Sequence, residues 1–155
     1  MKRLLLAVVL MVVSTAAFCQ MFDGTIDGAI PGTMNDVSSH FIKKGYKFVN
    51  CPQCSDNIVF MEGKLALNQP KGEKVDVLIY IQKDDDGFVY AISLYYPKEE
   101  QLALQYKIHR DVFANSFGRP SKSYVTKSKW EFGTYVYTIG VEEQLVYHTL
   151  KINRK

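Results

Sequence analysis

Two segments with helical periodicity divide this sequence, and each is followed by residues whose apolar positions alternate. Residues 34–44 place apolar side chains at helical spacing, begin after Thr33 with an acidic residue three positions later, and stop at Gly45. Residues 98–117 carry a second apolar stripe and stop at Gly118. We therefore expect two helices, one before and one after a first group of strands.

The period of two in the remaining segments predicts antiparallel strands. No helix alternates singly with a strand, which argues against a parallel sheet. We expect an α+β fold in the order helix–strands–helix–strands, with an antiparallel sheet and the two helices on one face. The expected strands are 46–49, 58–61, 64–68, 75–81, 88–96, 124–126, 129–132, 135–141 and 145–152.

The first nineteen residues are typical of a secretory signal peptide. Lys2 and Arg3 precede an apolar run over 4–13, and small residues follow over 14–17. The apolar run is too short for a membrane span, which needs about twenty residues. We expect a signal peptide at 1–19, cleavage after Cys19, and a single α+β domain over 20–155 that is periplasmic or secreted.

Two alternatives to this cleavage remain open. Cleavage after Ala16 or Ala17 would leave Cys19 as an odd thiol. Lipid modification of Cys19 would anchor the protein to a membrane, but Phe18 stands where a lipoprotein signal needs a small residue. We therefore favour a protein without a lipid anchor.

The charge balance excludes several partners. Removal of Lys2 and Arg3 with the signal leaves 17 of the 19 basic residues against 16 acidic ones. Such a nearly neutral chain has no electrostatic footprint for nucleic acid. No second apolar run reaches membrane length, so the mature chain is expected to have no transmembrane segment.

Several local patterns resemble known exported proteins. The signal ending Phe18-Cys19-Gln20 is similar to those of exported Bacteroidetes proteins, and residues 30–37, 44–48 and 106–120 resemble a family of small, uncharacterised exported proteins of that phylum. The layout is also similar to the helix-plus-β-meander units of β-lactamase inhibitor protein and of small outer-membrane assembly lipoproteins. The resemblance implies this fold and no catalytic residue.

Cys51-Pro52-Gln53-Cys54 is the sharpest local motif. Redox-active pairs of this spacing sit at a helix N-terminus, whereas here a loop and a strand are expected after Cys54. A zinc site would need more ligands than the two cysteines and scattered histidines offer. We expect a structural disulfide between Cys51 and Cys54, with a thiol-redox or metal-binding protein as the alternative function.

Other candidate sites have ordinary structural interpretations. The three acids before Gly87 lack the alternating ligands of a calcium loop and predict a hairpin turn, for which we expect type I′ geometry. His109 is expected on the solvent side of the second helix and His148 to be partly buried. Because no catalytic motif is present, we expect no enzyme, and no catalytic, metal or cofactor site is predicted.

Aromatic residues crowd the C-terminal strands. Such rows usually form core packing or cross-strand pairs. Trp130, Tyr135 and Tyr137 would instead form a recognition surface if they lay on the sheet face opposite the helices, because Tyr and Trp are favoured interface anchors. The leading hypothesis is therefore an exported, non-catalytic binding or interaction module. Its partner would be an unknown protein or glycan of the cell envelope.

Overall fold

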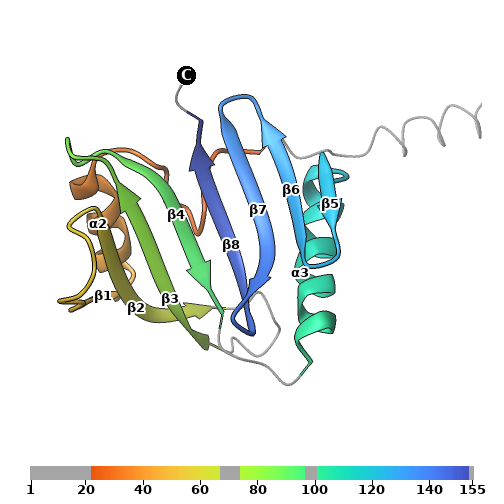
Figure 1. The fold of residues 1–155 in the computed structure, drawn as a ribbon, viewed down its shortest axis with the longest axis horizontal. Coiled ribbons are helices and arrows are strands. Elements are labelled where there is room, and N and C mark those ends of the chain that lie inside the picture. Colours follow the sequence, from red (N-terminus) through yellow and green to blue (C-terminus); the bar gives the residue numbers. More distant parts are fainter. Residues whose placement is uncertain (1–21, 67–73, 97–100, 154–155) are drawn as a thin grey trace, which may run out of the picture.

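The computed structural model describes residues 22–66, 74–96 and 101–153, and its fold is α+β. Helix α2 (Met34–Lys43) precedes four strands, and helix α3 (Leu102–Phe117) precedes four more (Figure 1). The strands form one antiparallel sheet in the order β1-β2-β3-β4-β8-β7-β6-β5. Their bounds are β1 Lys47–Val49, β2 Ile58–Ala66, β3 Lys74–Lys83, β4 Val89–Tyr95, β5 Lys122–Tyr124, β6 Lys127–Phe132, β7 Tyr135–Glu142 and β8 Leu145–Ile152. The predicted order of helices and strands is confirmed.

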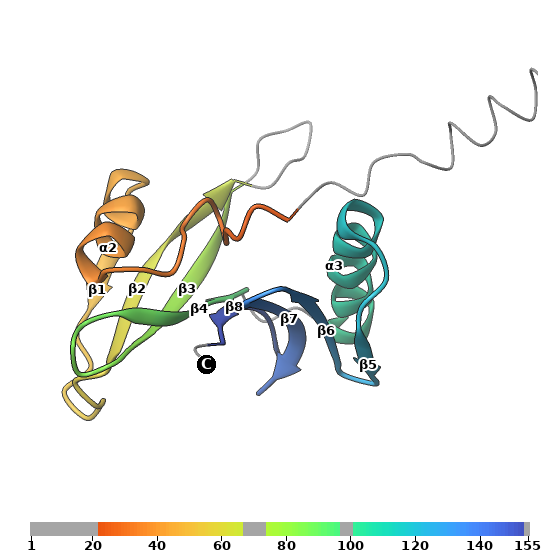
Figure 2. The same cartoon turned by 90° about the horizontal axis from the view of Figure 1, so that it is seen from above.

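Both helices lie on the same face of the sheet, at opposite ends (Figure 2). Helix α3 packs on β7 and β8, while the segment 22–32 crosses the space between the helices. The core lies between these elements and one sheet face, and the other face carries no helix. Fully buried core side chains include Phe41, Met61, Ile79, Ile81, Ile92, Trp130, Ile139 and Leu150.

The predicted capping of α2 is confirmed. The Thr33 hydroxyl oxygen accepts a hydrogen bond from the Asp36 amide at 3.2 Å, and the Thr33 hydroxyl donates to the Asp36 carboxylate at 2.6 Å. Gly45 follows the helix with a φ of +90°, a conformation that glycine adopts without steric cost. Val37 and Phe41 then face the core.

Helix α3 ends as predicted, with Gly118 as C-cap and its amide donating to the Ala114 carbonyl. The predicted residues 98–100 at its start lie outside the described part of the chain. Two apolar residues of the predicted stripe, Ile108 and Val112, are 45% and 61% exposed. The buried side of α3 is therefore narrower than predicted.

Three strand predictions are wrong. The predicted strands 58–61 and 64–68 are one strand, β2, because Gly63 accommodates the Tyr46 ring instead of making a turn; residues 67–68 lie outside the description. The predicted strand 124–126 ends at Tyr124. Residues 125–126 are a turn that pairs Tyr124 with Lys127.

The predicted acidic hairpin is present between β3 and β4, but its turn is not of the predicted type I′. Gly87 has a φ of +79°, but no positive φ occurs at Asp85 or Asp86, so the turn is not type I′. The Gly87 amide donates to the Asp84 carbonyl, which is typical of a longer loop with glycine in the left-handed position. Positive φ values at successive residues occur instead at Glu143 and Gln144, between β7 and β8.

Candidate functional site

The side chains of Trp130, Tyr135 and Tyr137 lie on the helix side of the sheet, so the condition for the recognition surface is not met and these residues do not form it. Trp130 is 1% exposed and Tyr137 is 5% exposed, and Tyr135 is partly buried against the core. Trp130 pairs with Tyr137 across β6 and β7, and the Phe113 ring of α3 stacks on Tyr137 at 4.2 Å. These aromatic residues hold α3 on the sheet.

A different set of rings occupies the helix-free face. Tyr80 lies between the fully buried Ile79 and Ile81, and because side chains alternate along a strand it projects from the opposite face. The same alternation places Phe60, Tyr95 and Tyr147 beside it. These four partly exposed side chains, from β2, β3, β4 and β8, are called the aromatic row below.

The strand register makes the row continuous. Phe60 pairs with Tyr80, and their ring centroids are 5.1 Å apart. Tyr95 pairs with Tyr147, and these centroids are 5.8 Å apart. From three inter-strand steps and one two-residue diagonal offset, the row spans roughly 16 Å.

Polar groups border the aromatic row. The Tyr95 hydroxyl donates to the Glu142 carboxylate at 3.2 Å, and Gln82 donates to the Tyr80 hydroxyl at 3.2 Å. Burial, followed by the Glu142 charge, raises the pKa of Tyr95 above its ordinary value, so this phenol stays neutral. The hydroxyls of Ser93 and Thr149, 2.7 Å apart, lie between the rings on β4 and β8.

Gly140 sets the position of the Tyr147 ring. A Cβ at Gly140 would lie 2.6 Å from the ring's outer carbon and oxygen, so only glycine leaves this space open. The ring of Tyr147 therefore crosses the backbone of β7 instead of standing away from the sheet. This arrangement leaves one ring face toward solvent.

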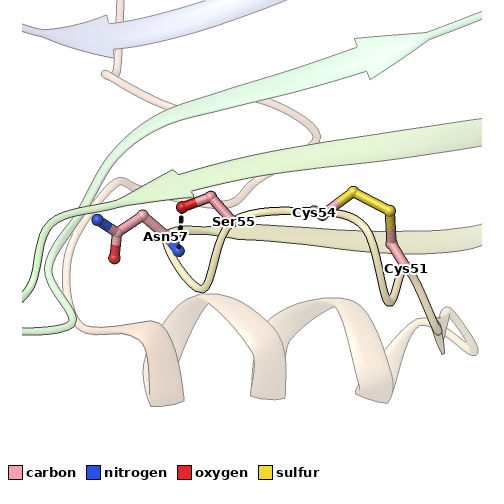
Figure 3. The surroundings of a disulfide bond; sticks show 4 residues. All are labelled: Cys51, Cys54, Ser55 and Asn57. Atoms are coloured by element: carbon pink, nitrogen blue, oxygen red, sulfur yellow. Dashed lines mark hydrogen bonds between the residues drawn. A yellow bond between two sulfur atoms is a disulfide. The ribbon is translucent and has the colours of Figure 1, made fainter.

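Cys51 and Cys54 lie at disulfide-bonding distance in the loop between β1 and β2, with Cα atoms 5.4 Å apart (Figure 3). The Cys54 amide donates to the Cys51 carbonyl, so the pair closes a tight turn. The next residues, Ser55 to Asn57, form a turn that leads into β2. No helix begins after Cys54, so its thiol lacks the helix N-terminus that activates redox cysteines.

A hydrogen-bonded chain, buried at His148 and Tyr137, joins α3 to the sheet, and the sequence prediction for His109 was wrong. His109 is not on the solvent side of α3: its Nδ1 lies 2.7 Å from Nε2 of His148. Nδ1 of His148 lies 2.8 Å from the Tyr137 hydroxyl. Burial, with a smaller contribution from His109, lowers the pKa of His148 to about 3, and burial also lowers the pKa of His109. We refer to these three side chains as the histidine chain.

The sequence contains signals for the aromatic row and for the histidine chain, neither of which was predicted. Tyr80, Tyr95 and Tyr147 each follow an aliphatic residue that faces the core, so simple alternation assigns them to the other face. His109 lies three positions after Tyr106 and four before Phe113, on the buried stripe of α3.

No metal site was predicted, and no group of three or more metal-ligating side chains occurs within 22–66, 74–96 and 101–153. The Asp84 and Asp85 carboxylates accept hydrogen bonds from the Phe88 amide and the Asn57 side chain, which gives both a structural role. Neither helix of the described chain is long and apolar enough to cross a membrane.

Comparison of the chain with protein-family models, curated proteins and solved structures finds no match in any of the three.

Proposed function

We propose that this chain is an exported, non-catalytic binding module that holds an extended glycan along the aromatic row. The observation that carries the proposal is the row itself, which consists of the ring pairs Phe60–Tyr80 and Tyr95–Tyr147 on the helix-free face. Export rests on the signal-like residues 1–19, which lie outside the described residues.

The chemistry of the row suits sugar rings. The apolar C–H face of a pyranose packs on an aromatic ring, and the Tyr147 ring presents such a face because it lies across Gly140. Polar groups that border the row, from Thr149 and Gln82, match the hydrogen-bonding groups of a sugar.

The size of the row favours a narrow ligand over a globular protein. A partly exposed aromatic side chain leaves roughly 50 Å² accessible, so four of them offer about 200 Å². A stable protein partner needs about 800 Å² on each side. A polysaccharide chain, by contrast, needs only a track about as long as the row.

The test is retention of the mature protein on insoluble cell-envelope material, before and after protease digestion of that material. We expect wild-type protein to bind both preparations equally, because the ligand is the glycan. The double variant Tyr95→Ser, Tyr147→Ser should lose at least about tenfold in affinity, since loss of each stacked ring costs on the order of 1 kcal/mol.

Phe48→Ser is the matched control, because Phe48 is 54% exposed on β1 and lies outside the row. This variant should bind as wild type does. Loss of binding after protease digestion would identify a protein partner and overturn the glycan proposal. Unchanged binding by the tyrosine double variant would show that the row is not the binding surface.

We propose a structural role for Cys51 and Cys54. The pair closes a turn within the loop that precedes β2, and the loop is tied to the β3–β4 hairpin by the hydrogen bond from Asn57 to Asp85. A redox role would need an activated thiol, and the turn after Cys54 supplies no helix N-terminus for this.

A further inference from the structure

The histidine chain is the only set of coupled imidazoles among the described residues, and it lies where α3 meets the sheet. His109 comes from the middle of α3, His148 from β8 and Tyr137 from β7. His148 is 9% exposed. The histidine chain therefore lies in the contact between α3 and the sheet. A change in the protonation of its imidazoles acts directly on that contact.

The neutral chain satisfies each of its inner nitrogen atoms. The Tyr137 hydroxyl donates to Nδ1 of His148, and Nε2–H of His148 then donates to Nδ1 of His109. No buried side-chain nitrogen or oxygen among the described residues lacks a hydrogen-bond partner. With both imidazoles neutral, the contact is closed.

Protonation of both imidazoles is incompatible with this geometry. A protonated histidine carries hydrogen on both nitrogens, so Nδ1–H of His109 would face Nε2–H of His148 across 2.7 Å. Two donors and two positive charges cannot share that distance in a buried site. One proton can be accommodated by reversing the hydrogen bonds, whereas the second forces the rings apart.

The surroundings offer little compensation for such charges. Directly after β4, the Tyr96 ring lies against both imidazoles, with ring centroids 4.6 Å apart for His109 and 5.1 Å apart for His148, and from the segment 22–32 the Asp27 charge acts on Tyr96. On α3, Arg110 and Lys107 both pair with Asp111. From β7, the facing titratable group is Tyr137 itself. No described carboxylate forms a hydrogen bond or ion pair with either imidazole.

We propose that the histidine chain is an acid-sensitive latch that releases α3 from the sheet. Uptake of two protons separates His109 from His148 and opens the contact between α3 and strands β7 and β8. Opening uncovers Phe113 and the indole of Trp130, whose Nε1–H is bonded to the Gly118 carbonyl at the end of α3. The rest of the sheet, with Met61 and Ile79 fully buried near α2, keeps its packing.

Amide hydrogen exchange on the folded protein tests the latch. Protection of the α3 amides, corrected for intrinsic exchange rates, should fall between pH 7 and pH 5 and should be lower than that of the β2 and β3 amides at each pH, because these strands exchange only through global unfolding. With a folded pKa of about 3 for His148, that histidine alone raises the opening equilibrium about 25-fold over this interval. The lowered pKa of His109 adds to the change.

The emission of Trp130, the only tryptophan of the chain, gives a second readout and should shift to longer wavelength over the same pH range. His109→Gln removes one titrating group from a partly exposed position, and His148→Gln removes the other. His148→Gln should reduce the pH dependence of α3 protection at least about fivefold, and His109→Gln should also reduce it. His40→Gln on α2 is the matched control and should behave as wild type.

Two results would overturn the proposal. The first is equal protection of α3 and of β2 and β3 at each pH, which would mean that α3 opens only through global unfolding. The second is a pH dependence of α3 protection that is the same in His109→Gln as in wild type. The second result remains decisive if His148→Gln fails to fold.

Discussion

Replacement of Gly63 by alanine should destabilise this protein, although alanine is normally the better residue in a strand. Gly63 lies in the interior of β2, opposite Val77. A Cβ added at Gly63 would lie 2.6 Å from the base of the Tyr46 ring and 2.8 Å from its edge. Contacts this short require the ring or the strand to move.

The Tyr46 ring has little freedom to move. It is 3% exposed, it packs on Phe41 with ring centroids 5.4 Å apart, and its hydroxyl donates to Asp27 at 3.4 Å. Overpacking of a buried site costs about 1–3 kcal/mol, and alanine recovers about 0.5–1 kcal/mol of chain entropy. Loss of the hydrogen bond to Asp27 adds about 1 kcal/mol. We expect a net loss of about 2 kcal/mol for Gly63→Ala.

Urea unfolding followed by Trp130 fluorescence and by circular dichroism measures this loss. The matched control is Gly140→Ala, where the new Cβ meets the outer end of the partly exposed Tyr147 ring, which can swing into solvent. This control should change stability by less than about 0.5 kcal/mol. In a Tyr46→Ala background, Gly63→Ala should no longer destabilise. Equal effects of the two glycine substitutions, or an undiminished loss without Tyr46, would refute the reasoning.

Three further predictions concern protonation, cross-linking and turn geometry. The folded pKa of His148, about 3, lies below its ordinary 6.5, so the unfolded chain binds more protons between these values; we expect the free energy of unfolding to fall by about 2 kcal/mol from pH 7 to pH 5. Denaturant titrations should show this drop for wild type and a smaller one for His148→Gln; equal drops would contradict it. Intact-mass analysis should show no alkylation of Cys51 or Cys54 without reductant, and replacement of both by serine should cost at most about 2 kcal/mol, because the closed ring is small; two alkylated thiols in native protein would contradict the disulfide. Gln144→Gly should stabilise the protein by about 1 kcal/mol in thermal unfolding, since Gln144 has a φ of +68°; a lower melting temperature would contradict it.

Local signals predicted the helices well. The start of α2 follows from Thr33 and Asp36, and both helix ends follow from glycines, because caps involve residues within a few positions of each other. The α+β order follows from the change of period along the chain. These features need no knowledge of distant contacts.

Predictions that depend on distant residues failed. The continuity of β2 across Gly63 was missed because the Tyr46 ring, which this glycine accommodates, comes from seventeen positions earlier in the sequence. The burial of Trp130 and Tyr137 depends on which sheet face α3 covers, and alternation within one strand does not specify this. The aromatic row could have been predicted from alternation within a strand. Because Ile79 and Ile81 face the core, Tyr80 between them must face the opposite side of the sheet.

The measurement that most directly tests the binding face is oxidative footprinting of the protein with and without protease-treated envelope glycan. We predict that bound glycan protects Tyr80, Tyr95 and Tyr147 from modification and leaves the exposed Phe48 unchanged. Unchanged reactivity of all three tyrosines in the bound sample, or protection confined to Phe48, would contradict the proposal that the helix-free sheet face binds the ligand.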